Sequence, residues 1–274
     1  MASHSLSDQA AIPSSAGPSV FPSCDLFGMP LACATAAEVM AHVFSELDAG
    51  RGGWLVTANL DFLRRHVRDR AARALYAGAD LRVADGMPLV WAARLQGATM
   101  PERIAGSSLM LPLVERAAEA GRSVYLLGGE PAANAAAAAL LMARWPSLRL
   151  CGASSPMVGS PPTPEELGAL RNAIVPLRPD LLLVGMGSPK QEQIIHALRA
   201  ELPSTWMIGV GISFSLVAGH QRRAPAWMQR SGLEWCWRLA QDPRRLARRY
   251  LVEDLPFSLE LLAHVLRRRA ARRR

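Results

Sequence analysis

The chain is almost without lysine: Lys190 is the only one among 31 basic residues, and the others are arginine. Paired cysteines are also missing. Cys24, Cys33, Cys151 and Cys236 lie far apart, with no Cys-x-x-Cys pair and no histidine at ligand spacing. This pattern argues against structural zinc and disulfide bonds, and predicts free thiols in a reducing compartment.

Long hydrophobic runs are absent as well. The longest uncharged apolar stretch covers residues 206–218, which is too short to span a bilayer, and its glycines and serines favour a strand followed by a turn. The first residues have neither the basic start nor the apolar run of a signal peptide. Residues 1–23, rich in Ser, Ala and Pro, are predicted to form a disordered leader.

Several catalytic motifs are missing. The sequence has no Walker A motif, no Asp-x-Asp and no His-Glu-x-x-His, so it shows no ligands for the usual metal-dependent handling of phosphate. Any diphosphate would have to be neutralised by arginines, Lys190 and backbone amides. No Gly-x-Gly-x-x-Gly follows the first expected strand, which argues against a dinucleotide cofactor. We therefore predict neither a metal nor a cofactor.

What is present is a regular alternation of apolar runs and helix-like segments. The chain has 274 residues, 50% of them hydrophobic and 20% charged, which suits one large α/β domain, alone or with an appendage. The alternation predicts βαβ units and a Rossmann-like, mainly parallel sheet. The expected strands are 53–57, 81–84, 123–127, 148–153, 181–185 and 206–210. The expected helices are 36–47, 60–77, 87–95, 107–120, 131–145, 164–177 and 190–202.

The positive charge is concentrated at the C-terminal end. Residues 238–274 contain eleven arginines against four acids, so nearly all of the net charge of +8 comes from this segment. We predict a catalytic domain over residues 24–222 and a helical, arginine-rich appendage over residues 223–274, with a helix starting at Pro243. An apolar helix with a basic end suits an anionic membrane surface. A docking helix with a solvated basic tail and a nucleic-acid contact are the alternatives.

Polar side chains lie at the ends of two expected strands, and an arginine lies in a later loop. Asp85 comes directly after a short apolar strand, where it could act as a general base or cap the helix that starts near Met87. Thr57 and Asn59 end the preceding strand, and helix capping is again the alternative for Asn59. Arg103 could bring a cation to the same edge or simply face solvent.

Glycine-containing turns stand at the ends of three other expected strands. They comprise Gly128-Gly129, Gly185-Met186-Gly187 and Gly209-Val210-Gly211. In open α/β sheets, ligands bind beyond the carboxyl ends of the strands, where glycine lets the backbone approach an anion. The second turn leads into Ser188-Pro189-Lys190-Gln191-Glu192. The alternative there is an ordinary strand-to-helix turn with a solvated lysine.

In their order along the chain, these segments resemble the WecG/TagA/CpsF family of bacterial glycosyltransferases. The resemblance runs from about residue 25 to residue 251. Its pieces are Thr57-Ala58-Asn59, Ala84-Asp85-Gly86, Glu102-Arg103-Ile104-Ala105-Gly106, Leu126-Leu127-Gly128-Gly129-Glu130-Pro131, Gly185-Met186-Gly187-Ser188-Pro189-Lys190-Gln191-Glu192, Gly209-Val210-Gly211, Arg223-Ala224-Pro225, Gly232-Leu233-Glu234-Trp235, Arg238, Arg245 and Arg248. One departure is Ser215, which stands where relatives usually carry an aspartate.

The resemblance implies an inverting transferase that moves a hexose from a UDP-sugar to a polyprenyl-diphosphate-linked acceptor, without an essential metal. It implies Asp85 as the catalytic base, with Thr57, Asn59 and Gln191 as polar contacts and Arg103 on the sugar or phosphate side. It also implies a lipid-diphosphate site, to which we assign Arg223, Arg238, Arg245 and Arg248. We further expect substrate contacts from Gly128, Gly129, Gly185, Gly187, Lys190, Glu192, Gly209 and Gly211.

The predicted partners are therefore the UDP-sugar donor, the lipid-linked acceptor and the inner face of the cell membrane, but no nucleic acid. The donor sugar (N-acetylmannosamine, glucose or a related hexose) and the polysaccharide pathway stay open, with a slight preference for exopolysaccharide. The oligomeric state stays open too, a homo-oligomer included. A Rossmann-type oxidoreductase acting on a nucleotide-sugar and a non-enzymatic binding module are the rival hypotheses.

Overall fold

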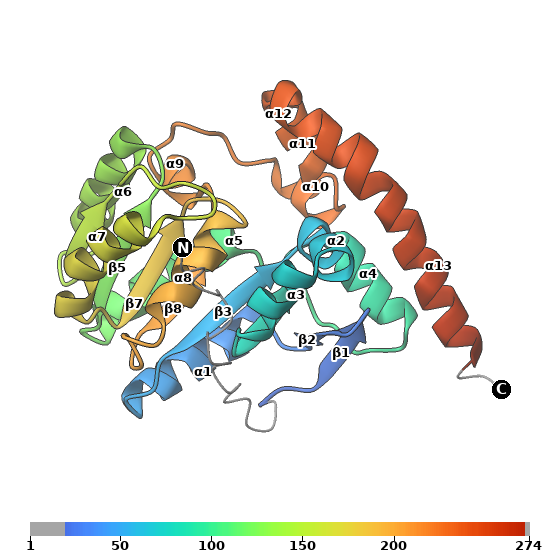
Figure 1. Cartoon of the computed structure of the whole chain (residues 1–274), viewed down its shortest axis with the longest axis horizontal. Coiled ribbons are helices and arrows are strands. Elements are labelled where there is room, and N and C mark those ends of the chain that lie inside the picture. The colour runs from blue at the N-terminus through green and yellow to red at the C-terminus, as the bar shows by residue number, and fades with distance from the viewer. Residues whose placement is uncertain (1–19, 272–274) are drawn as a thin grey trace, which may run out of the picture.

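The computed structural model describes residues 20–271, apart from the side chains of Arg230 and Arg245. Its centre is a six-stranded, all-parallel sheet with strand order β4-β3-β8-β7-β5-β6 (Figure 1). The strands are β3 (Gly53–Ala58), β4 (Leu81–Ala84), β5 (Ser123–Gly128), β6 (Arg149–Ser154), β7 (Leu181–Gly185) and β8 (Trp206–Gly209). The predicted α/β fold is confirmed, and each expected strand lies within one residue of its observed ends.

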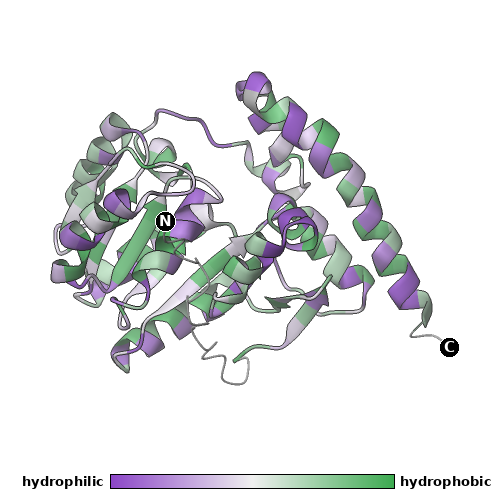
Figure 2. Ribbon diagram, viewed as in Figure 1, coloured by the Kyte–Doolittle hydropathy of each residue, from purple (hydrophilic) through white to green (hydrophobic). Residues whose placement is uncertain are grey.

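The sheet is covered on both faces, which explains why its central strands β7 and β8 are continuously apolar. Successive side chains of a strand point to opposite faces, so in β7 Leu182 and Val184 pack on one side while Leu181 and Leu183 pack on the other. All four are fully buried. Figure 2 shows the same pattern as hydrophobic strands enclosed by helices with mixed surfaces.

Helices α2, α3, α7 and α8 contribute to the core on the first face, and α1, α5, α6 and α9 to the core on the second. The helices up to α9 are α1 (Ala36–Asp48), α2 (Leu60–Arg68), α3 (Arg70–Ala77), α4 (Met87–Leu95), α5 (Gly106–Glu119), α6 (Pro131–Arg144), α7 (Pro164–Ile174) with the 3₁₀ turn η1 (Val175–Leu177), α8 (Lys190–Leu198) and α9 (Ser213–Val217). The prediction of one helix over residues 60–77 is wrong, because Asp69 has an extended backbone (φ −124°, ψ 115°). Its side chain accepts a hydrogen bond from the backbone N–H of Ala71 and so begins α3.

An antiparallel hairpin precedes the first expected strand and was not predicted. It pairs β1 (Ser23–Leu26) with β2 (Met29–Ala32) through Phe27 and Gly28, whose φ values are 53° and 83°. Positive φ at both central residues matches a type I′ turn, which suits the twist of a hairpin. Most of the predicted leader, residues 1–19, lies outside the described residues.

The C-terminal helices form an arm beside α2 and α4 (Figure 1). They are α10 (Ala226–Arg230), α11 (Glu234–Gln241), α12 (Pro243–Ala247), the π-helical segment η2 (Arg248–Asp254) and α13 (Leu255–Ala271). Helix α12 begins at Pro243, as predicted. Helix α13 buries Phe257, Leu261 and Val265 in the core cluster on the first face. Within residues 20–271, no helix has both the length and the apolar composition needed to cross a membrane.

Candidate active site

Two adjoining cavities open beyond the carboxyl ends of β3, β4 and β8, between the sheet and the C-terminal arm. The first, which we call the sheet-edge cavity, measures about 470 Å³ and is lined largely by polar groups. The second, the arm cavity, measures about 280 Å³ and lies between the start of α4 and the segments α11 and η2. The two cavities share Asn59, Asp85, Glu234, Arg238, Arg249 and Tyr250.

Asp85 stands where the two cavities meet. Its backbone N–H donates to the Ala58 carbonyl at 2.7 Å, which holds it directly beyond β4. The capping interpretation is wrong, because Gly86 is the N-cap of α4 and no side chain caps that helix. The Asp85 side chain is half-buried: it faces the cavities and is otherwise surrounded by protein. This burial raises the pKa of Asp85 to about 7, against the opposing effect of the Arg103 and Arg238 charges.

The end of β3 supplies Thr57 and Asn59. Thr57 is buried and lines the sheet-edge cavity, while Asn59 lines both cavities. The Asn59 side chain also accepts a hydrogen bond from the Phe62 N–H at 3.2 Å, so the capping interpretation is confirmed for this residue. Asn59 therefore fixes the start of α2 and faces the cavities from the same position.

Gly106, the first residue of α5, was part of the recognised motif but received no role from it. A Cβ atom at this position would lie 2.7 Å from the Gly209 carbonyl oxygen and 3.2 Å from Thr57 Oγ1. The backbone N–H of Gly106 also hydrogen bonds the Asp85 carboxylate and lowers its pKa. Glycine is thus needed for α5 to begin against β3 and β8, close enough to contact Asp85.

Gln191 links the first turn of α8 to the turn after β8. Its Oε1 accepts from the Gly211 N–H at 3.2 Å, and its Nε2 donates to Glu192 Oε1 at 2.7 Å. A Cβ on Gly209 would lie 2.4 Å from Gln191 Nε2 and would displace the Gln191 amide from this position. Gly187, Gln191, Gly209 and Gly211 all line the sheet-edge cavity.

Other residues predicted to contact substrate line neither cavity. A Cβ at Gly128, Gly129 or Gly185 would fall within 3.0 Å of Met186 or Phe214 side-chain atoms, so close packing accounts for these glycines. Lys190 Nζ donates to the Val158 carbonyl, and Glu192 is only 2% exposed. Substrate contact by these five residues stays a prediction. Ser215 lies in α9 and also lines neither cavity.

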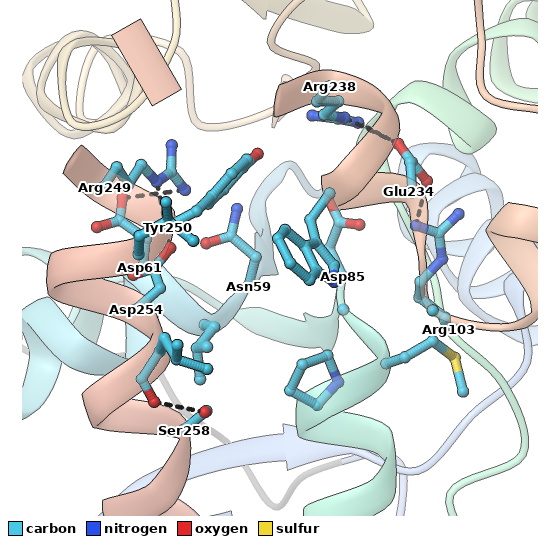
Figure 3. A pocket seen from close by; sticks show the side chains of 18 residues that line it. Asn59, Asp61, Asp85, Arg103, Glu234, Arg238, Arg249, Tyr250, Asp254 and Ser258 are labelled. Carbon is cyan, nitrogen blue, oxygen red and sulfur yellow. Dashed lines mark hydrogen bonds and ion pairs between the residues drawn. The ribbon is translucent and has the colours of Figure 1, made fainter. Parts of the chain in front are cut away.

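Three of the predicted arginines lie at the cavities. Arg103 donates from Nη1 to Glu234 Oε2 at 2.6 Å, and Arg238 donates from Nε to Glu234 Oε1 at 3.0 Å (Figure 3). Arg223 lines the sheet-edge cavity and donates to the Ser108 hydroxyl. Sequence reasoning gave Glu234 no role, although the residue lay within the recognised Gly-Leu-Glu-Trp segment.

The structure places Arg249, rather than Arg248, at the cavities. The Arg248 side chain is 86% exposed and lines neither cavity, whereas Arg249 lines both. Arg249 Nη2 lies 3.2 Å from Asp61 Oδ2, and Asp61 is 1% exposed. Which of the two neighbouring arginines faces the cavities depends on how η2 packs beside α2, where Asp61 lies, and this packing could not be read from sequence spacing. The side chain of Arg245 lies outside the described part of the structure.

In Figure 3 Asp85 lies between two groups of charged side chains: Arg249, Asp61 and Asp254 on one side, and Arg103, Glu234 and Arg238 on the other. Among the described residues, no group of three or more His, Cys, Asp or Glu side chains is arranged to hold a metal ion. The positive charge that faces the cavities comes from arginine.

The sequence model of the Glycosyl transferase WecG/TagA/CpsF family matches residues 24–271 of the chain. The match includes the sheet, both cavities and the C-terminal arm.

Proposed function

Because the chain belongs to the WecG/TagA/CpsF family of glycosyltransferases, we propose that it moves a hexose from a UDP-sugar to a polyprenyl-diphosphate-linked saccharide in bacterial surface or exopolysaccharide biosynthesis. The observation that carries the proposal is the position of Asp85, a carboxyl with a pKa of about 7 where a polar and a partly apolar cavity meet. The family also favours a transferase over the oxidoreductase and the binding module.

The sheet-edge cavity suits the UDP-sugar. Thr57, Gln191 and the backbone of Gly209 and Gly211 offer hydrogen-bonding groups at the carboxyl ends of parallel strands, where α/β proteins bind nucleotides. Arg223 adds a positive charge at the same cavity for the diphosphate.

The arm cavity suits the lipid-linked acceptor. Met87, Trp235, Leu251 and Leu255 give it an apolar lining, and the last three side chains are 41%, 49% and 53% exposed. Arg103, Arg238 and Arg249 line the same cavity. A cavity lined by both arginines and exposed apolar side chains fits a diphosphate attached to a hydrocarbon chain.

In the proposed reaction, Asp85 removes the proton from the acceptor hydroxyl as its oxygen attacks the anomeric carbon. The bond from that carbon to the UDP oxygen breaks on the opposite face, and UDP leaves with the electron pair, so the configuration inverts. A base with a pKa near the working pH suits this step. The arginines stabilise the charge that develops on the diphosphate, without a resident metal.

The exposed surface of α13 supports the proposal that the protein binds to a membrane surface. Leu255, Leu259, Leu262 and Leu266 are each at least 44% exposed and recur every three or four residues, which places them on one helix face. Leu251 continues this apolar face back to the arm cavity. Three arginines, residues 267–269, follow it. We propose that this face lies on the anionic inner surface of the cell membrane.

Flotation with lipid vesicles tests the membrane contact. The L259E/L262E double variant is expected to lose binding to vesicles of anionic lipid. Leu140→Glu is the matched control, since it changes a 50% exposed leucine on α6, far from the arm. Equal flotation of the double variant and the wild type would contradict the contact.

The reaction itself is tested by transfer from a panel of UDP-sugars to a synthetic polyprenyl-diphosphate-sugar in the presence of EDTA. Turnover with one donor is expected and would identify the sugar. Binding of UDP without turnover would point to a different acceptor. The absence of both turnover and UDP binding would contradict the proposed function.

A further inference from the structure

Glu234 is a carboxylate of the arm that faces the same two cavities as Asp85. It opens α11 and lines both cavities together with Asp85. The preceding turn is packed tightly against α4, since a Cβ on Gly232 (φ 75°) would lie 2.8 Å from Trp91 and 2.9 Å from Met87. Because α4 starts directly after Asp85 and Gly86, this contact fixes Glu234 relative to the proposed base.

Each oxygen of Glu234 accepts from a different arginine. Oε2 accepts from Arg103 Nη1 at 2.6 Å, across the junction between the core and the arm, and Oε1 accepts from Arg238 Nε at 3.0 Å within α11. The side chains of Glu234 and Arg103 are 13% and 15% exposed. Both arginines are thus oriented by one shielded carboxylate, and neither lies within ion-pair distance of Asp85.

The charges around Asp85 are balanced by this arrangement. Arg103 and Arg238 attract the Asp85 carboxylate, while Glu234 repels it. Arg249 and Tyr250 of η2 line the same cavities, and Asp61 and Asp254 hold the Arg249 charge. Without Glu234, two guanidinium groups would face one carboxylate, and a direct ion pair with Asp85 would weaken it as a base.

We propose that Glu234 is a positioning residue of the transfer reaction: it holds Arg103 and Arg238 around the substrate site and keeps both guanidinium groups from pairing with Asp85. The proposal rests on the transferase reaction given above.

The Glu234→Gln variant tests this role, because it keeps the side-chain shape and removes the charge. The readout is the pH profile of kcat/KM, whose acidic limb reports the ionisation of Asp85 in the free enzyme. Loss of the repelling charge lowers the pKa of Asp85, so the limb is expected to move to lower pH by about one unit. We also expect a loss of about 10²-fold at the optimum, because both arginines lose their fixed positions. An acidic limb at the wild-type pH would overturn the proposal, whatever the rate.

The Arg103→Gln variant tests the same contact, and the shift of the acidic limb expected for it has the opposite sign. It removes an attracting charge from Asp85, so the acidic limb is expected to move to higher pH. This variant also decides the matter should Glu234→Gln fail to fold, as judged by circular dichroism. A limb that stays in place or moves to lower pH in Arg103→Gln would overturn the proposal.

Glu260→Gln is the matched control. It removes a carboxylate of the same arm, one that pairs with Arg68 and lines neither cavity, and its pH profile is expected to match the wild type. If the wild-type protein shows no turnover, this result contradicts the transferase reaction rather than the role of Glu234. The titration of Asp85, followed by carboxyl ¹³C NMR in the wild type and Glu234→Gln, would then replace kinetics. Equal pKa values of Asp85 in the two proteins would overturn the proposal.

Discussion

The regions beyond β4 and β7 each hold an acidic side chain with a raised pKa, and they differ in what the side chain can reach. Asp85 follows β4 and lines both cavities. Glu192 lies in the first turn of α8, is 2% exposed and lines neither. Burial raises the pKa of each carboxyl to about 7. A raised pKa therefore marks a candidate base only where the group also opens to a site that a substrate can enter.

The two carboxyls also differ in the groups that surround them. Asp85 is surrounded by residues that line the cavities, namely Arg103, Arg238 and Gly106. Glu192 instead accepts from Gln191 Nε2 and holds that amide against the turn after β8. The carboxyl of Asp85 is therefore open to a ligand in the cavities, whereas Glu192 supports the wall of the sheet-edge cavity.

The sharpest test of this comparison is Asp85→Asn. We expect kcat to fall about 10²–10⁴-fold, because the amide cannot accept the proton of the acceptor hydroxyl. Binding of UDP and the circular dichroism spectrum should stay as in the wild type, since Asp85 caps no helix. Turnover close to the wild-type rate would remove Asp85 from the mechanism.

The arginines of the arm allow a second, paired test. Arg249→Gln should lower kcat/KM for the lipid-linked acceptor by about 10-fold to 10²-fold, as expected for a hydrogen bond to a charged group. Asp61 keeps Arg64 and Arg65 as partners in this variant, so the fold should persist.

Arg248→Gln is the matched control, because this neighbour is 86% exposed and lines neither cavity. We expect its kcat/KM to stay within about twofold of the wild type, as for other exposed substitutions. A large loss in Arg248→Gln with little change in Arg249→Gln would restore the assignment that the family resemblance gave to Arg248.

Most of the core could be predicted from the sequence. The six parallel strands are short apolar runs between helix-like segments, and their carboxyl ends bring Thr57, Asn59 and Asp85 together because parallel strands end at one edge. Gln191 joins them through its contact with the turn after β8.

What could not be predicted depends on tertiary contacts. Arg249 faces the cavities where η2 lies beside α2 and pairs with Asp61, and Glu234 does so because the Gly232 turn packs on α4. The Phe27-Gly28 hairpin lacks the usual Asn-Gly or Asp-Gly signal. Lys190 appeared informative because it is the only lysine, yet rarity in a composition does not say which atom a side chain contacts.

The Glu192 region gives a prediction about stability. The folded protein keeps the Glu192 proton up to about pH 7, whereas the unfolded chain releases it near its ordinary value of 4.5. The folded state therefore binds more protons between these values, and the free energy of unfolding falls as pH rises through this window. In Glu192→Gln the side chain is neutral at every pH, so its free energy of unfolding does not fall in this way. Relative to the wild type, it should gain about 3 kcal/mol on going from pH 5 to pH 8.

Thermal unfolding of the wild type and Glu192→Gln at both pH values measures this gain. Activity at pH 7 is expected to stay within about tenfold of the wild type, since the new amide oxygen can still accept from Gln191. No change in relative stability between pH 5 and pH 8 would contradict the buried, protonated state. A fall in activity as large as that of Asp85→Asn would remove the distinction between the two carboxyls.

Lys190→Gln should have the smallest effect. The ammonium group donates to the Val158 carbonyl and lines neither cavity, so its loss should cost about 1–1.5 kcal/mol of unfolding free energy and leave kcat unchanged. The measurement that decides is KM for the UDP-sugar. A value within about twofold of the wild type means that Lys190 fixes the loop around Val158 against α8. A tenfold rise would mean that the ammonium group turns toward the donor phosphates when they bind. The start of α8 would then take part in binding, and the contrast between the β4 and β7 regions would hold for Glu192 alone.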